Sequence, residues 1–144
     1  MRITPRHVIV LTFVLATHLA FTSCSITKGK KIAEVAADKF HAQFNAGQYH
    51  EIFSESDEAF QKAIGGEANT IGLFEALRGK LGVIKEAKQA GWHVNANTAG
   101  SMVSLQYEVE YTEGKGAEQL VFIVKGDKAM LFNYNVNSPL LITR

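Results

Sequence analysis

Apolar residues follow a helical spacing before residue 83 and a strand-like alternation after it. In the first part we expect helices over about residues 30–46, a broken helical region over 48–64, and a helix from Asn69 or Thr70 to residue 81. The buried stripe predicted for the first helix repeats every four residues: Ile32, Ala36, Phe40 and Phe44. Glycines at positions 47, 65, 66 and 82 stand where these helices are expected to end.

The second part predicts a meander of about four antiparallel strands. Its clearest alternation lies in residues 103–111, where apolar and polar residues take turns. Residues 120–124 are all apolar and predict a central strand covered on both faces. The last strand, about 128–136, is expected to place Met130, Phe132, Tyr134 and Val136 on one side. Helices followed by such a meander predict an α+β fold, with the N-terminal helices packed on a curved antiparallel sheet.

A separate apolar stretch lies near the N-terminus, at residues 8–21, after Arg2 and Arg6. A spanning helix needs about 20 apolar residues, so this stretch favours an export signal over a permanent anchor. The following residues, Leu-Ala-Phe-Thr-Ser-Cys-Ser at 19–25, resemble a bacterial lipoprotein signal, in which the cysteine becomes lipidated and N-terminal. Cleavage by the ordinary signal peptidase, after Thr22, is the alternative.

Cys24 is the only cysteine of the chain, so it has no partner for a disulfide within the chain. An unpaired thiol is a reactive liability in an exported protein. Lipidation of its sulfur would remove that thiol. We therefore expect a lipoprotein signal peptide at 1–23, a short tether at 24–29 and a single α+β domain at 30–144. The resemblance implies a palmitate-type anchor in a membrane of the bacterial cell envelope, the outer membrane if the bacterium is Gram-negative.

The charge balance argues against a nucleic-acid partner. Removing residues 1–23 takes two arginines and no acid from the 15 basic and 14 acidic residues, which leaves the remaining chain at −1. Nucleic-acid binding would require a clustered basic face instead. The local cluster Lys28, Lys30 and Lys31 can contact anionic head groups beside the anchor or can simply be a solvated helix start.

Several segments carry a resemblance to a known group of proteins. They are Phe-Asn-Ala-Gly-Gln-Tyr at 44–49, Leu-Arg-Gly-Lys-Leu-Gly at 77–82, the strand at 103–111 and the closing hairpin. The chain resembles small exported bacterial proteins of unknown function with a cystatin-like, nuclear-transport-factor-two-like domain. It lacks the aromatic residue that such domains often carry in the last hairpin. The fold includes ketosteroid-isomerase-like enzymes, which implies an acid or histidine base beside a tyrosine in the cone of the sheet.

The residues themselves offer no clear catalytic set. Glu108 and Glu110 fall on the polar phase of their strand, which is typical of a solvated surface, and Asp57 is placed to cap a helix. The histidines after residue 23, at positions 41, 50 and 93, have no metal-ligand spacing, so no metal or cofactor is predicted. His41 lies one step off the apolar stripe and is expected to be exposed.

One group of aromatic residues can line a pocket on the concave face of the sheet. Its members are Trp92, Tyr107, Tyr111, Phe132 and Tyr134. Packing in the core is the alternative, and the more frequent role of such stripes. The polar face of the sheet is an equal candidate for docking another protein or a second copy of the chain. These patterns favour a non-enzymatic domain that binds a small molecule, peptide or protein, with a ketosteroid-isomerase-like enzyme as the alternative.

Overall fold

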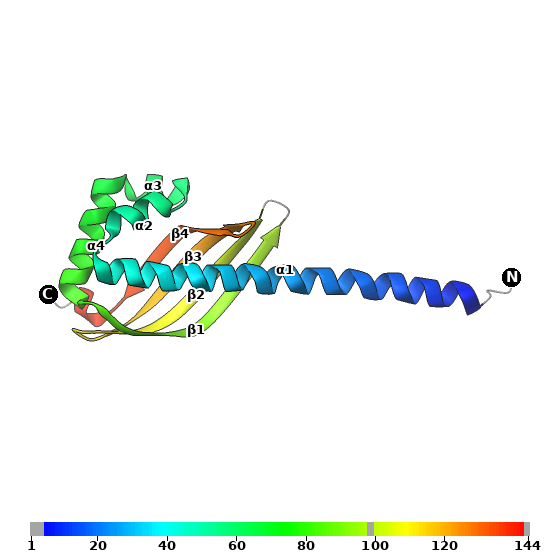
Figure 1. The fold of residues 1–144 in the computed structure, drawn as a ribbon. Coiled ribbons are helices and arrows are strands. Elements are labelled where there is room, and N and C mark those ends of the chain that lie inside the picture. The colour runs from blue at the N-terminus through cyan, green and yellow to red at the C-terminus, as the bar shows by residue number, and fades with distance from the viewer. Residues whose placement is uncertain (1–4, 98–99, 143–144) are drawn as a thin grey trace.

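A computed structural model describes residues 5–97 and 100–142, with side chains described for 26–96 and 100–142. Within these residues four helices precede four strands (Figure 1); the strands are as predicted, and the broken helical region expected at 48–64 is two separate helices. The elements are α1 (Pro5–Ala46), α2 (Tyr49–Glu55), α3 (Glu58–Ile64), α4 (Glu67–Leu81), β1 (Ile84–Asn97), β2 (Gly100–Tyr111), β3 (Lys115–Lys125), β4 (Lys128–Asn137) and the short 3₁₀ helix η1 (Pro139–Leu141). The α+β class is thereby confirmed.

The strands form one curved antiparallel sheet in the order β1-β2-β3-β4. Helix α1 lies across one face of this sheet. Helices α2, α3 and α4 lie around the C-terminal end of α1 (Figure 1). The N-terminal part of α1 extends beyond the sheet. Residues 24–29, expected to form a tether, belong to this continuous helix, whereas the side chain of Cys24 lies outside the described residues.

The ends of the short helices follow from local chemistry. Asp57 caps α3, as predicted, by accepting a hydrogen bond from the backbone N–H of Ala59 at 2.9 Å. The predicted start of α4 at Asn69 or Thr70 is wrong, because the helix begins at Glu67 with Gly66 as its N-cap. Gly66 has a φ of 99°, which a residue with a side chain rarely adopts, so the chain turns there directly into the next helix.

The sheet confirms the alternation of β2 and corrects two other predictions. The prediction that β3 is covered on both faces is wrong: Val121 and Ile123 are only half-buried, since the helices cover one face of the sheet. In β4 the pairing shifts, with Val121 opposite Asn133 and Phe122 opposite Leu131. Phe132 therefore has no partner on β3, and the side chains before and after it alternate in opposite phase. Leu131 is buried in the core, and Met130 and Phe132 do not share a side with Tyr134.

The core lies between α1, the short helices and the concave face of the sheet. Rings from four elements pack on one another, with Phe74 of α4 in contact with Phe40, Phe44, Tyr49 and Tyr134 at centroid distances of 5.6–6.1 Å. At the end of α1, the side chain of Asn45 bonds both the N–H and the C=O of Ile84, at 2.8 and 2.9 Å. Helix α1 is thus fixed to the start of the sheet at this end.

Candidate functional site

The structure brings together only some of the residues expected to line a pocket. Tyr107 and Tyr111 are buried on the concave face of β2, and Tyr134 reaches the same region from β4. Trp92, on the edge strand β1, is 52% exposed, with the Lys30 ammonium 5.3 Å from its ring centroid. Phe132 lies on the other phase of β4 and is not part of the core cluster.

Tyr111 and Tyr134 meet at a buried carboxyl group that the sequence analysis did not single out, that of Glu118 on β3. Both phenol hydroxyls donate to its Oε1, at 2.6 Å from Tyr111 and 2.8 Å from Tyr134. Its Oε2 lies 2.8 Å from Nε2 of His41 on α1. The His41 ring in turn packs edge-on against Tyr107, with centroids 5.1 Å apart. We call Glu118, His41, Tyr111 and Tyr134 the Glu118 cluster.

The placement of His41 and Glu118 follows from the same periodicities that predicted the fold. Glu118 is in phase with Leu120 and Phe122, which face the core of the molecule. His41 follows Ala37 by four residues and precedes Phe44 by three, which places it on the buried face of α1. The prediction that His41 is exposed is therefore wrong: its exposed fraction is 8%.

Burial and the nearby carboxylate change the acidity of the tyrosines. Burial, followed by the charge of Glu118, raises the pKa of Tyr111 and of Tyr134 well above the usual value. The pKa of Tyr107 rises to about 12, mainly through burial and then through the charges of Asp38 and Glu34. All three hydroxyls therefore stay protonated at neutral pH, and those of Tyr111 and Tyr134 act as hydrogen-bond donors to Glu118.

The Glu118 cluster is enclosed. No member of it lines either of the two hollows described below. Among the described residues, every buried side-chain nitrogen or oxygen atom has a hydrogen-bond partner. Because its four members come from α1, β2, β3 and β4, the cluster connects the helix to three strands through polar contacts.

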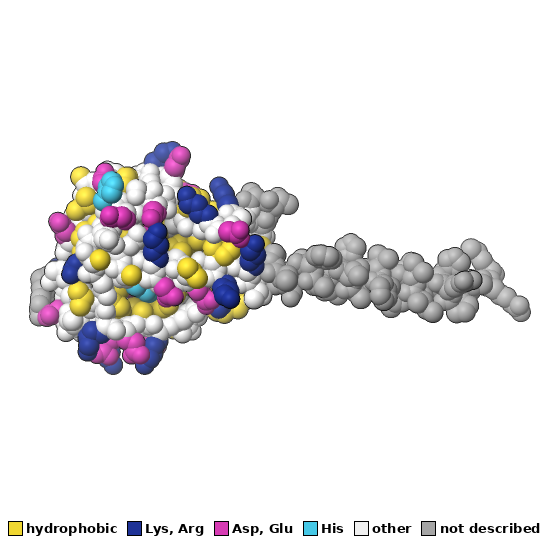
Figure 2. All heavy atoms as spheres, viewed as in Figure 1, with side chains coloured by type: hydrophobic (Ala, Val, Ile, Leu, Met, Phe, Trp, Pro, Cys, Tyr) yellow, Lys and Arg dark blue, Asp and Glu magenta, His cyan; other side chains and the backbone are white. Residues whose placement is uncertain are grey.

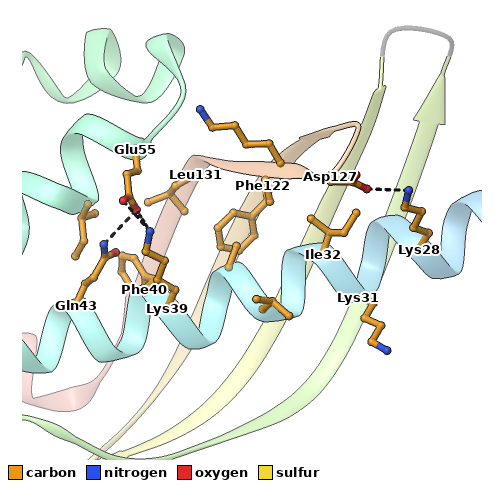
Figure 3. A pocket seen from close by; sticks show the side chains of 15 residues that line it. Lys28, Lys31, Ile32, Lys39, Phe40, Gln43, Glu55, Phe122, Asp127 and Leu131 are labelled. Carbon is orange, nitrogen blue, oxygen red and sulfur yellow. Dashed lines mark hydrogen bonds and ion pairs between the residues drawn. The ribbon is translucent and has the colours of Figure 1, made fainter.

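The larger hollow is a groove of about 730 Å³ beside α1, open to solvent on one side (Figure 3). We call it the α1 groove. Its walls are apolar side chains from α1, α2, β3 and β4: Ile32, Val35, Ala36, Phe40, Ile52, Phe122, Ala129 and Leu131. Val35 is 64% exposed there, although it is a large apolar residue. None of the five aromatic residues expected to line a pocket belongs to this groove.

Charged side chains close the two ends of the α1 groove (Figure 3). At one end Lys28 pairs with Asp127 at 2.8 Å, and at the other Lys39 pairs with Glu55 at 2.6 Å. Lys39, together with a hydrogen bond from Gln43, lowers the pKa of Glu55. Figure 2 shows hydrophobic surface on this side of the molecule with both basic and acidic side chains around it.

The outer face of the sheet is polar, as expected from its sequence. Lys85 pairs with Glu110 at 2.7 Å, and Lys88 with Glu86 at 3.2 Å. A second hollow of about 580 Å³ lies on this side, beside Glu108 and Ile142. His50 is exposed and pairs with Glu67, and no group of three metal-ligating side chains occurs among the described residues.

The raised pKa of Tyr107 predicts a loss of stability in alkaline solution. Between pH 10, where a tyrosine of the unfolded chain ionises, and about 12, where folded Tyr107 does, only the unfolded chain has lost the proton. The contribution of Tyr107 to the free energy of unfolding is therefore fully present below pH 10. Above pH 10 the free energy of unfolding falls by up to about 1.4 kcal/mol per pH unit for each such tyrosine. Urea unfolding on both sides of pH 10 measures this. A Tyr107→Phe variant should show a weaker dependence, and ionisation of all tyrosines of the folded protein near pH 10 would contradict the prediction.

None of the helices, as far as the chain is described, is long and apolar enough to cross a membrane. Comparison with known proteins finds no matching family model and no curated protein with significant similarity to the chain.

Proposed function

We propose that this chain is a lipoprotein of the bacterial envelope whose domain binds a ligand in the α1 groove without transforming it. The observation that carries the proposal is the groove itself, an open hollow of about 730 Å³ with apolar walls and charged ends. Its volume falls within the range of roughly 300–1,000 Å³ that is typical of small-molecule sites. Val35 is exposed in this groove and Ile32, Ala36 and Ala129 are half-buried, so an apolar ligand would find surface there that the protein itself does not cover.

The position of the groove agrees with a membrane tether at Cys24. Lys28, at one end of the groove, follows Cys24 by four residues in the same helix, which corresponds to about 6 Å along the axis. A domain held by a lipid at Cys24 would therefore keep this end of the groove close to the membrane surface. The basic residues Lys28, Lys30 and Lys31 would face the head groups there.

The residues of the groove favour binding over catalysis. A general base needs a pKa raised towards neutrality, usually by burial. Glu55, the acid on α2, has a lowered pKa because of Lys39, and the pKa of Asp127 is lowered by Lys28. Both carboxylates are therefore stable anions in ion pairs, suited to holding a cation rather than to removing a proton from a substrate.

An enzyme of the ketosteroid-isomerase-like type remains the second candidate, because of the Glu118 cluster. A desolvated carboxyl group beside two tyrosine donors is the combination that such chemistry uses. The cluster would have to open before a substrate could reach Glu118, since its oxygens already have three partners. Isomerisation of a β,γ-unsaturated ketosteroid that is lost in Glu118→Gln would favour this candidate over binding alone.

The tether is tested by the intact mass of the protein expressed in a bacterium with its own signal. We expect a wild-type mass that lacks residues 1–23 and includes acyl chains on Cys24. The Cys24→Ser variant should lack the acyl mass and leave the membrane fraction or remain uncleaved. Wild-type protein without acyl mass would contradict the lipoprotein proposal.

A further inference from the structure

We propose that the α1 groove takes a single-chain anionic amphiphile, a fatty-acid-like molecule drawn from the membrane. The inference rests on the proposed function and names its ligand class. The apolar walls would cover the hydrocarbon chain, and a lysine at an end of the groove would bind the anionic group. Three features support this choice: the chemistry of the walls, the charges at the rim, and the length of the groove between its exposed ion pairs.

The walls favour a hydrocarbon chain over a peptide. A peptide strand would bring N–H and C=O groups into the groove, and each would need a hydrogen-bond partner. Gln43 has the only uncharged polar side chain in the described lining, and its amide already donates to Glu55 at 3.1 Å. A hydrocarbon chain requires no such partner and would cover Ile32, Val35 and the other apolar side chains.

The rim favours an anion. Four lysines and two acids line the groove, which leaves an excess of positive charge. Lys128 has no ion pair among the described residues, although its charge contributes to the lowered pKa of Glu55. The ammonium of Lys31 points away from the groove, so Lys28, Lys39 and Lys128 are the cations available to a ligand (Figure 3).

A ligand can replace the acidic partner in the ion pairs at the two ends of the groove. Lys28 and Asp127 are 65% and 85% exposed, and exposed pairs of this kind contribute little stability. A ligand carboxylate can therefore replace Asp127 or Glu55 at its lysine with little loss. Lys28 and Gln43 are fifteen residues apart on α1, about 22 Å along the helix, so the groove suits an extended chain.

The test uses the full chain in phosphatidylcholine vesicles and a hexadecanoate that carries a photoreactive diazirine on its chain. After illumination, labelled peptides are mapped by mass spectrometry. We expect labels on residues 32–43 and 122–131. Ala36→Phe, which fills the groove, should reduce this labelling by about tenfold, the factor that corresponds to loss of a modest apolar contact. Ala42→Phe is the matched control, because Ala42 is an exposed residue of the same helix outside the groove, and it should leave the labelling unchanged.

Competition and charge variants test the anion. Unlabelled hexadecanoate should displace the probe, whereas hexadecanol and hexadecyltrimethylammonium should compete weakly. Lys128→Glu should reduce labelling severalfold, and Lys88→Glu, on the outer face of the sheet, should not. Equal competition by the alcohol, or displacement by an acidic leucine-rich peptide and not by hexadecanoate, would overturn the proposal.

The outcomes separate this inference from the function on which it rests. If Cys24 is acylated and the groove holds another ligand that Ala36→Phe excludes, absence of hexadecanoate labelling refutes the ligand class alone. If the groove is labelled in a protein without acyl mass, the tether is refuted and the ligand class stands. Labelling that is the same in wild type and Ala36→Phe overturns the inference in either case.

Discussion

Replacing Glu118 with alanine should lower the free energy of unfolding by about 3–5 kcal/mol, the cost typical of removing one partner from a buried polar network. The change leaves the hydroxyls of Tyr111 and Tyr134 without their acceptor and takes away the partner of His41 Nε2. Each stranded buried group costs about 1–3 kcal/mol. Domains of this size are stable by only about 5–15 kcal/mol, so the variant should unfold at a much lower urea concentration.

Two further variants isolate the cause of this loss. Glu118→Gln keeps an acceptor oxygen for the tyrosines and should lose clearly less stability than the alanine variant. Glu108→Ala removes the same side chain from an exposed position on the neighbouring strand, and should change stability by no more than about 0.5 kcal/mol. Equal losses for Glu118→Ala and Glu108→Ala would show that the cluster does not hold α1 on the sheet.

Replacing Phe74 with alanine should cost a similar amount, about 3–5 kcal/mol, because it leaves a cavity in the core. Phe74 is fully buried, and its ring contacts aromatic rings from α1, the start of α2 and β4. The free energy of unfolding in urea measures the effect. Leu73 is the neighbouring residue of α4 and is 39% exposed, so Leu73→Ala should cost less than about 1 kcal/mol. A Phe74→Ala loss as small as that of Leu73→Ala would contradict the packing described for α4.

Local patterns predicted the elements of the fold well. The alternation in β2 and the glycines that end the helices depend on neighbours in sequence, so they are visible in the printed chain. The irregularity in β4 is different. Skipping Phe132 depends on how β4 pairs with β3, and that pairing is not encoded in the spacing of β4 alone.

The candidate site was harder to predict for a related reason. Glu118 and His41 are polar residue types in apolar phases. They are stable there because they meet each other across 77 positions of sequence and because Glu118 also accepts from Tyr111 and Tyr134. The sequence does show these phases: Glu118 precedes Leu120 by two residues on β3, and His41 follows Ala37 by four residues on α1. The position of the α1 groove depends on where α1 crosses the sheet, which the sequence pattern does not reveal. Aromatic residues of β1, β2 and β4 were therefore expected at the pocket, whereas the groove is lined by other residues, from α1, α2, β3 and β4.

Occupancy of the α1 groove tests the central claim of a binding domain most directly. Protein expressed with its own signal is released from the membrane and its native mass is recorded for wild type, Ala36→Phe and Ala42→Phe. We expect wild type and Ala42→Phe to carry a non-covalently bound additional mass that Ala36→Phe lacks, because Ala36 lines the groove and Ala42 does not. The same bound mass in all three proteins, or none in wild type, would contradict the claim that the groove is the binding site.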